Sequence, residues 1–354
     1  MPSPVPEQYA PFVIPSSLSE IIAALHKPLD ETLGLKNPPK QPTTGAKPVL
    51  KHAGGSAAGH ARLEHLIASG AMTTYKDTRN GMSRADDSTK LSAWLALGCL
   101  SARQVHWALI DFEEARTPLG KGAHGYGRGE NKGTGWVRFE LLWRDYFRLT
   151  TKKFGPRLFR AEGFRGEKEN WKRDDEALRR FLEGTTGTGL VDASQRELFL
   201  SGYTSNRARQ NVGSFLAKHL YLDWRLGAEW YECCLVDYDV SSNWGNWQYV
   251  AGVGNDPRGE ARVFNPVKQA FDYDAHGEYV REWVEELRGL EGLEEVFACW
   301  KVDGARRREV GLQGNEGAES PLKRIEYRPG KSRGGGGGGR GGRGGGRGGG
   351  RGRK

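Results

Sequence analysis

Residues 205–247 read SNRARQNVGSFLAKHLYLDWRLGAEWYECCLVDYDVSSNWGNW. Four tryptophans fall in this stretch, out of eleven in a chain of 354 residues, and they are mixed with Arg, Asn and paired Asp. Indole is a large apolar body and also an oxidisable π-system. The cluster is therefore compatible with three roles: a core, a platform on which bases stack, or a path for electrons.

The two ends of the chain have compositions that do not predict a folded core. Ten of the 16 prolines lie in residues 1–50, which favours a linker with one short helix at 18–25. Residues 331–354 hold 15 Gly, six Arg and two Lys, and carry +8 of the net charge of +9. Such a run cannot bury a core, so we expect a disordered tail after a nearly neutral body.

Cysteine usage and hydropathy narrow the class of protein. The four cysteines (Cys99, Cys233, Cys234 and Cys299) form no CxxC pair and no metal-ligand spacing with His, so no metal site is predicted. Unpaired cysteines of this kind favour a reducing, intracellular compartment. Apolar runs are too short for a membrane span and the start lacks a signal-peptide pattern. We expect a monomer in the nucleus or cytoplasm, with no targeting peptide.

The middle of the chain is expected to be mainly α-helical. Apolar residues recur at helical spacing in four stretches, 91–110, 136–151, 205–224 and 279–290. The Gly-rich stretch 117–135 predicts an exposed loop, because no strand precedes its glycines as a dinucleotide fingerprint would require. There is no GxSxG, HExxH or P-loop motif, so hydrolase and metalloenzyme functions have no support.

Two groups of residues outside the Trp-rich stretch could carry chemistry. Ser88, Thr89 and Ser92 open an expected helix, where hydroxyls and free N–H groups can bind a phosphate; the alternative is a plain helix cap. Glu140, Trp143 and Arg144 fall on one helix face and could hydrogen-bond and stack a base. The alternative for this second group is a surface Glu140–Arg144 pair beside a buried Trp.

A third group lies inside the Trp-rich stretch. Asp237 and Asp239 are separated by one residue in apolar surroundings, and burying two carboxylates requires partners. Arg207 and Arg209 are the candidate partners. A solvated loop is the alternative, which the surrounding aromatic residues make the weaker one.

Together these groups resemble the photolyase/cryptochrome family, and most nearly its cryptochrome-DASH branch. The matching phrases are YKDTRNGM (75–82), WLALGCLS (94–101), FELLWRDYFR (139–148), EGTTGTGLVDASQREL (183–198), TSNRARQNVGSFLAKHLYLDWRLGAEW (204–230), LVDYDVSSNWGNWQY (235–249) and AGVGNDPR (251–258). The resemblance covers roughly residues 54–274 and concerns the family's all-helical FAD-binding domain. It implies a linker remnant at 1–53, the FAD domain at 54–300, a linker at 301–330 and a disordered RGG-type tail at 331–354.

The resemblance also implies roles for individual residues. Residues matching the FAD contacts are Tyr75, Ser88, Thr89, Lys90, Leu91, Ser92, Arg209, Asp237, Asp239 and Asn243. Arg209 and Asp237 match a salt bridge over the flavin, and Asn243 matches the residue that faces its reactive nitrogen. The residues that match the electron-hopping chain are Trp247, Trp224 and Trp171. The residues that match the grip on a DNA lesion are Arg79, Glu140, Trp143, Asn206, Arg207, Tyr249 and Gln269.

The implied activity is blue-light-driven repair of cyclobutane pyrimidine dimers by electron transfer from reduced FAD, a carbon–carbon lyase reaction. Glu140 would hydrogen-bond the dimer carbonyl. Tyr249 stands where classical photolyases carry a second Trp, and Gln210 replaces a Met. A smaller ring stacks less on a dimer leaving a duplex, so we expect a preference for single-stranded DNA.

Two other functions remain open from the sequence. The same FAD and Trp chain could serve a light-sensing or regulatory cryptochrome without repair. The Gly/Arg tail could bind RNA or other nucleic acid through phosphate charge and Arg stacking. An antenna folate is expected for full-length members of the family, but the α/β domain that holds it has no counterpart in this sequence.

Overall fold

The computed structural model describes Ser17, Ser19 and residues 35–43, 45–166, 169–255 and 263–327. The expected helix at 18–25, apart from Ser19, and the Gly/Arg tail at 331–354 lie outside the described residues. Within the described part the fold is α-helical, as predicted, and the β structure there is one isolated bridge between Lys172 and Leu222. No helix of this part is long and apolar enough to cross a membrane.

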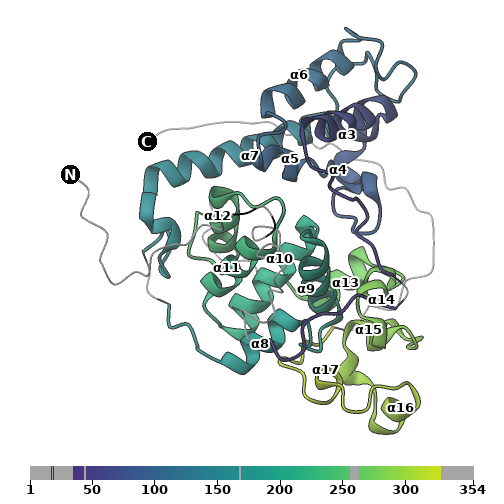
Figure 1. Ribbon diagram of the computed structural model, residues 1–354, viewed down its shortest axis with the longest axis vertical. Helices are drawn as coiled ribbons and strands as arrows, with labels where there is room; N and C mark the ends of the chain where they lie inside the picture. Colours follow the sequence, from purple (N-terminus) through teal and green to yellow (C-terminus); the bar gives the residue numbers. More distant parts are fainter. Residues whose placement is uncertain are drawn as a thin grey trace, which may run out of the picture.

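The helices form two groups with separate hydrophobic cores (Figure 1). The upper group comprises α3 (Ser56–Ser69), α4 (Tyr75–Thr78), α5 (Ser92–Ala96), α6 (Ala102–Glu113) and the start of α7 (Lys132–Phe154). The lower group comprises α8 (Asp175–Glu183), α9 (Gly189–Ser201), α10 (Asn206–Ser214), α11 (Trp224–Cys234), α12 (Val240–Ala251), α13 (Pro266–Tyr273), α14 (Glu278–Trp283), α15 (Leu293–Phe297), α16 (Gly304–Glu309) and α17 (Glu316–Glu319). Short 3-10 turns lie at Ala71–Thr73, Ala85–Asp87, Gly155–Phe159, Glu285–Leu287 and Cys299–Lys301.

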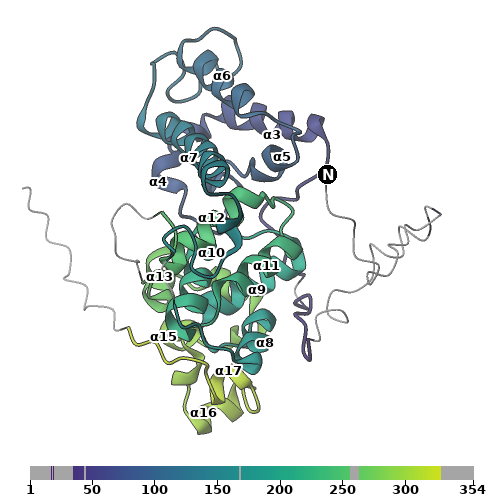
Figure 2. The ribbon, with the colours of Figure 1, turned by 90° about the vertical axis from the view of Figure 1, so that its left-hand side faces the viewer.

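Helix α7 joins the two groups (Figure 2). It begins at a cap in which Asn131 Oδ1 accepts hydrogen bonds from Gly133 N and Thr134 N at 2.8 and 3.1 Å. Val137, near its start, belongs to the upper core, whereas Phe147 packs nearly three turns further on against α12. One rigid helix therefore fixes how the two groups face each other.

Three expected helices are shorter than the hydrophobic pattern predicted. The stretch 91–110 is broken into α5 and α6, because Gly98 adopts a left-handed conformation (φ 72°) and Ser101 starts a new helix with a capping box. The stretch 205–224 is α10 followed by a π-helix, Phe215–Leu220, that ends at Tyr221. The stretch 279–290 divides into α14 and a 3-10 turn. In each case the apolar residues keep their helical spacing past the point at which the α-helix ends.

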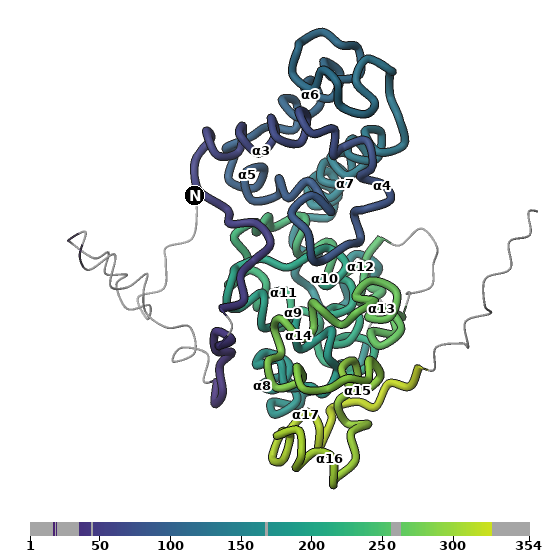
Figure 3. Tube along the Cα trace, turned by 90° about the vertical axis from the view of Figure 1, so that its right-hand side faces the viewer, coloured from purple at the N-terminus to yellow at the C-terminus, as the bar shows by residue number. Residues whose placement is uncertain are grey.

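The N-terminal and C-terminal segments that the composition assigned to linkers pack on the lower group in their described parts. Figure 3 shows residues 35–53 running beside this group and up to α3. Ala46 is buried, and His52 lies against the rings of Trp94 and Tyr203 at 5.3 and 5.0 Å between centroids. Leu312 and Ala318 are also buried in the lower core. Proline content did not reveal that these segments are held by contacts distant in sequence.

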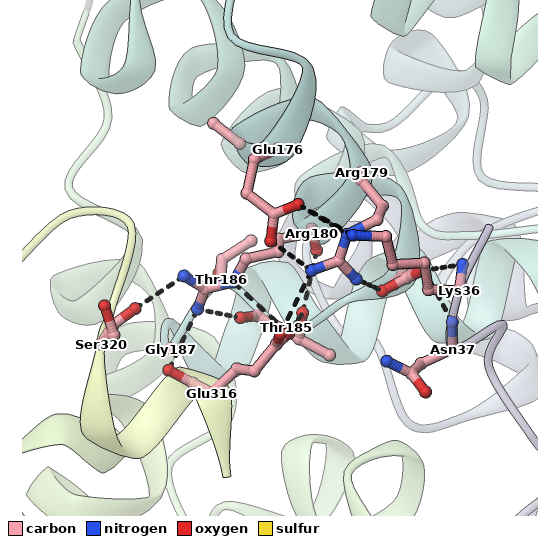
Figure 4. A network of polar contacts seen from close by, with 12 residues as sticks. Lys36, Asn37, Glu176, Arg179, Arg180, Thr185, Thr186, Gly187, Glu316 and Ser320 are labelled. Carbon is pink, nitrogen blue, oxygen red and sulfur yellow. Dashed lines mark hydrogen bonds and ion pairs between the residues drawn. The ribbon is translucent and has the colours of Figure 1, made fainter. Parts of the chain in front are cut away.

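A polar network on α8 holds both segments (Figure 4). The fully buried Glu183 carboxylate forms an ion pair with Arg179 and accepts hydrogen bonds from the backbone N–H groups of Lys36 and Asn37, at 2.6 and 2.8 Å. Arg180 donates to the carbonyl oxygen of Ser320 at 2.7 Å. Buried charges are stable only when paired in this way, so each segment supplies partners that α8 requires.

Glycine permits the closest helix contacts around α12. A Cβ on Gly245 of α12 would overlap the ring of Phe147, and a Cβ on Gly227 of α11 would overlap the ring of Trp247. These rings come from neighbouring helices, so the missing side chains set the spacing between α7, α11 and α12.

We predict that Gly245→Ala lowers the free energy of unfolding by about 1–3 kcal/mol, because the methyl group forces the Phe147 ring out of its place. The measurement is urea unfolding of the purified chain. Gly304→Ala is the matched control, since its Cβ would meet nothing within 4 Å. Equal midpoints for the two variants would show that the contact at Gly245 is not tight.

Candidate flavin and DNA-lesion cavity

A cavity of about 550 Å³ lies between α7, α10, α11, α12 and the segment before α5. Most of the site residues predicted from the sequence line it, namely Tyr75, Arg79, Ser88, Thr89, Lys90, Leu91, Ser92, Glu140, Trp143, Asn206, Arg209, Asp237, Asp239, Asn243, Trp247 and Tyr249. Residues that span 175 positions of the sequence therefore meet in one hollow. Arg207, Gln269, Trp171 and Trp224 are not among its lining residues.

The segment 88–92 forms one wall of the cavity. Lys90 is buried in a left-handed conformation (φ 51°), and its Nζ donates to Arg84 O at 3.0 Å and Ser88 Oγ at 3.4 Å. Burial lowers the pKa of Lys90 to about 8, against the opposing attraction of Asp87. The helix that follows has only five residues, so its dipole is small. The lysine charge and the hydroxyls are therefore the main means this wall has of binding an anion.

A buried ion pair forms a second part of the wall. Arg209 on α10 donates through Nη2 to both carboxylate oxygens of Asp237, at 2.9 and 3.1 Å, and through Nε to Thr204 O at 2.9 Å. The Asp237 side chain is 2% exposed. These contacts compensate the cost of burying Asp237 and of partly burying Arg209, and they hold the guanidinium beside the ring of Tyr203.

The start of α12 places two further polar groups. Asp239 caps the helix by accepting a hydrogen bond from Ser242 N at 2.9 Å, and it accepts another from Arg148 of α7 at 3.1 Å. Although burial opposes it, these two contacts hold the pKa of Asp239 below its usual value. Asn243, one turn later, donates through Nδ2 to Ala228 O of α11 at 2.9 Å. Its side chain is thereby held by the neighbouring helix.

Helix α7 contributes Glu140 and Trp143. Glu140 forms an ion pair with Arg79 and accepts a hydrogen bond from Trp136 Nε1 at 3.1 Å. The expected alternative, a pair with Arg144, does not form, because the Arg144 guanidinium turns to Leu95 O at 3.1 Å. Glu140 is thus fixed at the cavity wall by a cation from α4 and by an indole one turn before it.

Arg207 and Gln269 bind each other. Arg207 donates to Gln269 Oε1 at 3.0 Å and to Asn80 Oδ1 at 2.7 Å, and its guanidinium lies 4.4 Å from the ring centroid of Tyr273. The candidate pairing of Arg207 with the two aspartates is therefore wrong: Arg209 pairs with Asp237, and Arg148 with Asp239.

The tryptophans of the stretch 205–247, together with Trp171, lie at different distances from the cavity. Trp247 lines the cavity and meets Tyr231 edge-on at 5.1 Å. Trp224 is fully buried and donates to Ala161 O at 3.1 Å, and Trp171 points its Nε1 at the same oxygen from 3.5 Å. Trp244 packs edge-on against Trp224 at 5.8 Å, and Trp230 stacks on Phe199 within the core.

Sequence reasoning missed three buried groups at or behind the cavity. Tyr203 lines it and contacts both His52 and Arg209. Tyr231 also lines it, and its buried hydroxyl has no hydrogen-bond partner among the described residues. Glu197 is buried behind Lys90 and Arg209 and accepts a hydrogen bond from Tyr279 Oη at 2.6 Å. No local pattern marks these residues, because their burial arises from packing between distant helices.

The family is shown by comparison with known proteins. Residues 136–325 match the family model of the FAD-binding domain of DNA photolyase. Over 348 residues the chain is 51% identical to a putative mitochondrial cryptochrome DASH of Neurospora crassa, covering 91% of this chain and 46% of the relative. It is 48% identical over 282 residues to a cryptochrome DASH of Gloeobacter violaceus, covering 79% and 53%.

The structure is also similar to that of a cryptochrome from Synechocystis, with a TM-score of 0.68, 43% identity and coverage of 78% of this chain and 57% of that one. The protein is therefore a flavoprotein with a photolyase-type FAD-binding domain. It belongs to the photolyase/cryptochrome family, with relatives in the cryptochrome-DASH branch. The chain spans about half the length of the curated relatives it matches.

The residues of the cavity fit FAD. A diphosphate needs cations and donors, which Lys90 and the hydroxyls of Ser88 and Thr89 can supply. An isoalloxazine ring needs apolar walls with a few polar groups at its edge, and here Trp247 and Tyr231 stand beside Asn243. Tyr231 lines the cavity, and its buried hydroxyl has no hydrogen-bond partner among the described residues, which leaves it able to bond a polar ligand group.

We predict that Glu197 makes stability fall as the pH rises from 5 to 7. Burial raises the pKa of this carboxyl from 4.5 to about 7, although the Tyr279 hydrogen bond and the charges of Lys90 and Arg209 oppose the shift. The folded chain then holds a proton that the unfolded chain has lost, so ionisation costs folding about 2–3 kcal/mol across this window.

The measurement is urea unfolding at several pH values for the wild type and Glu197→Gln. The variant should lack this part of the pH dependence, and the difference between the two proteins cancels the contributions of His52 and His219, whose pKa values burial lowers. Parallel curves for the two proteins would contradict the prediction.

Proposed function

We propose that this chain forms the light-driven repair centre for cyclobutane pyrimidine dimers in single-stranded DNA, with FAD as its cofactor. One observation carries the proposal: the residues that match flavin contacts and five of the seven that match lesion contacts line the same cavity. Asn243 and Trp247 share it with Glu140, Trp143 and Tyr249. A cofactor and a flipped-out dimer bound there would be close enough for direct electron transfer.

Bound FAD in its reduced form supplies the photoexcited electron that splits the dimer. The chain's own residues bind and position the partners. Arg209 and Asp237 give a rigid polar wall, and Asn243 is held by Ala228 so that its position does not depend on ligand binding. Trp143 offers an indole face on which a base can stack.

Glu140 and Arg79 are proposed to contact the edges of the pyrimidines. In the structure Glu140 accepts from Arg79 and Trp136, so it is held in place before any substrate arrives. Pre-organised polar groups beside a centre that gains charge stabilise that charge without further rearrangement. Arg79 brings the positive charge of this pair.

The preference for single strands is proposed from Tyr249 and Gln210, which both line the cavity. A phenol ring offers less stacking surface than an indole ring. A dimer in a duplex must break its stacking and pairing before it enters the cavity, whereas a dimer in a single strand has already met that cost. Fewer contacts in the cavity therefore suffice for the single strand.

We predict that Glu140→Ala lowers the repair yield on a dimer-containing oligonucleotide about fivefold, the effect of losing a hydrogen bond of about 1 kcal/mol. FAD content, measured by absorption, should not change. Asp145→Asn is the control, because Asp145 is an exposed acid on the same helix and does not line the cavity. Unchanged repair in Glu140→Ala would remove this residue from the mechanism.

The same repair assay on the wild-type protein distinguishes DNA repair from a regulatory, light-sensing function. Photoreduction of bound FAD without repair of either single- or double-stranded dimers would favour a light-sensing role. The tail that suggested binding of RNA lies outside the described residues, and deleting 331–354 tests it separately through the salt dependence of nucleic-acid binding.

A further inference from the structure

Tyr221 occupies a backbone position that suits glycine. It follows the π-helix Phe215–Leu220, and its φ of 62° and ψ of 29° place it in the left-handed region. Bulky L-residues rarely adopt this conformation, because Cβ crowds the following carbonyl, and such strain clusters at functional sites. Glycine here would be free of strain, so the tyrosine side chain is the feature that needs an explanation.

The side chain makes two specific contacts at the surface. Its ring lies 5.5 Å from the ring of Trp171, at an angle of 41° between planes. Its hydroxyl donates to Glu169 Oε2 at 2.8 Å. Tyr221 as a whole is 37% exposed, whereas Trp171 is half-buried.

The backbone holds these two rings together. Lys172 N donates to Tyr221 O at 2.8 Å, within the isolated bridge that joins Lys172 to Leu222. The residue after Trp171 is thus bonded directly to Tyr221. The ring contact is therefore fixed by main-chain geometry, and does not depend on the rotamer of a free surface side chain.

The contact extends a series of aromatic rings that begins at the cavity. Trp247 lines the cavity, Trp224 is fully buried, and Trp171 and Trp224 both point their indole N–H groups at Ala161 O. Exposure then increases from Trp171 to Tyr221. The phenol is thus the most exposed ring of the series.

We propose that Tyr221 is the terminal electron donor of this aromatic series and that Glu169 accepts its proton. The inference rests on the proposed binding of FAD and on the role that the family resemblance implies for Trp247, Trp224 and Trp171, which is to supply an electron to the photoexcited flavin, the oxidant. The Trp171 radical cation takes one electron from the Tyr221 phenol, and the O–H bond breaks as the proton passes to the Glu169 carboxylate. The products are a neutral indole, a neutral phenoxyl radical and a carboxylic acid.

The contact with Glu169 makes this step chemically feasible. A phenol that loses an electron becomes strongly acidic, so a hydrogen-bonded carboxylate captures the proton and prevents the electron from returning directly. The hydrogen bond to Glu169 also raises the pKa of the Tyr221 phenol above its usual value, which keeps it protonated before oxidation. Glu169 also has a favourable Coulombic interaction with the charged side chain of Lys218. A thiol in solution, as a hydrogen-atom donor, would restore the phenol.

The test is flash excitation of the FAD-loaded chain, with the radicals followed by transient absorption and electron paramagnetic resonance. The wild type should yield a long-lived phenoxyl radical. Tyr221→Phe, which keeps the ring, should leave the radical on tryptophan and reduce the long-lived fraction about tenfold. Glu169→Gln should slow phenoxyl formation by a similar factor, since the amide cannot take the proton. Tyr126→Phe, remote from the series, is the control.

The outcomes separate the two proposals. A tryptophan radical with the same lifetime in the wild type and Tyr221→Phe would overturn the role of Tyr221 and leave the tryptophan series intact. Absence of any tryptophan or tyrosine radical in both the wild type and Tyr221→Phe would overturn both. A measurement without flavin checks the proton acceptor: in ultraviolet titration of the apoprotein, the phenol signal lost in Tyr221→Phe should shift to lower pH in Glu169→Gln. An unshifted signal would overturn the assignment of Glu169.

Discussion

The close approach of α12 to its neighbours is the constraint on which the site depends. Aromatic rings fill the places where Gly245 and Gly227 lack side chains, so α12 lies closer to α7 and α11 than ordinary side chains would allow. Helix α12 carries Asp239, Asn243 and Trp247. A small increase in its distance from either neighbour would therefore displace these three side chains together.

Charge in this protein is buried in matched sets behind the cavity as well as on its wall. Arg209 with Asp237 is one set, and Glu183 with Arg179 is another. Glu197 differs, because burial raises its pKa to about 7 although the Tyr279 hydrogen bond and the charges of Lys90 and Arg209 oppose the shift. Its protonation state is therefore set by the balance between burial and the neighbouring groups.

Much of the fold and the cavity could be predicted from the sequence. Long motifs such as 204–230 and 235–249 contain both the apolar residues of a helix and the polar residues of the site, so they indicate both at once. Lining residues as distant in the chain as Tyr75 and Tyr249 were identified in this way. The breaks at Gly98 and Tyr221 were not, since apolar spacing continues through both and only backbone conformation reveals them. The contact of His52 with Tyr203 likewise depends on packing between distant segments, which no local pattern encodes.

The network on α8 has a consequence for dividing the chain into pieces. The family resemblance would place the limits of the folded unit near residues 54 and 300. Removing the segment before 54 deprives the Glu183 carboxylate of two backbone donors, and removing the segment after 300 deprives Arg180 of its acceptors at Ser320 and Glu316. A piece cut at those limits would leave both buried charges with fewer partners, although Glu183 keeps Arg179 and Arg180 keeps the carbonyl oxygen of Thr185. The α8 network is therefore complete only in a piece that includes residues 36–320, because the partners of its buried charges come from both ends of that range.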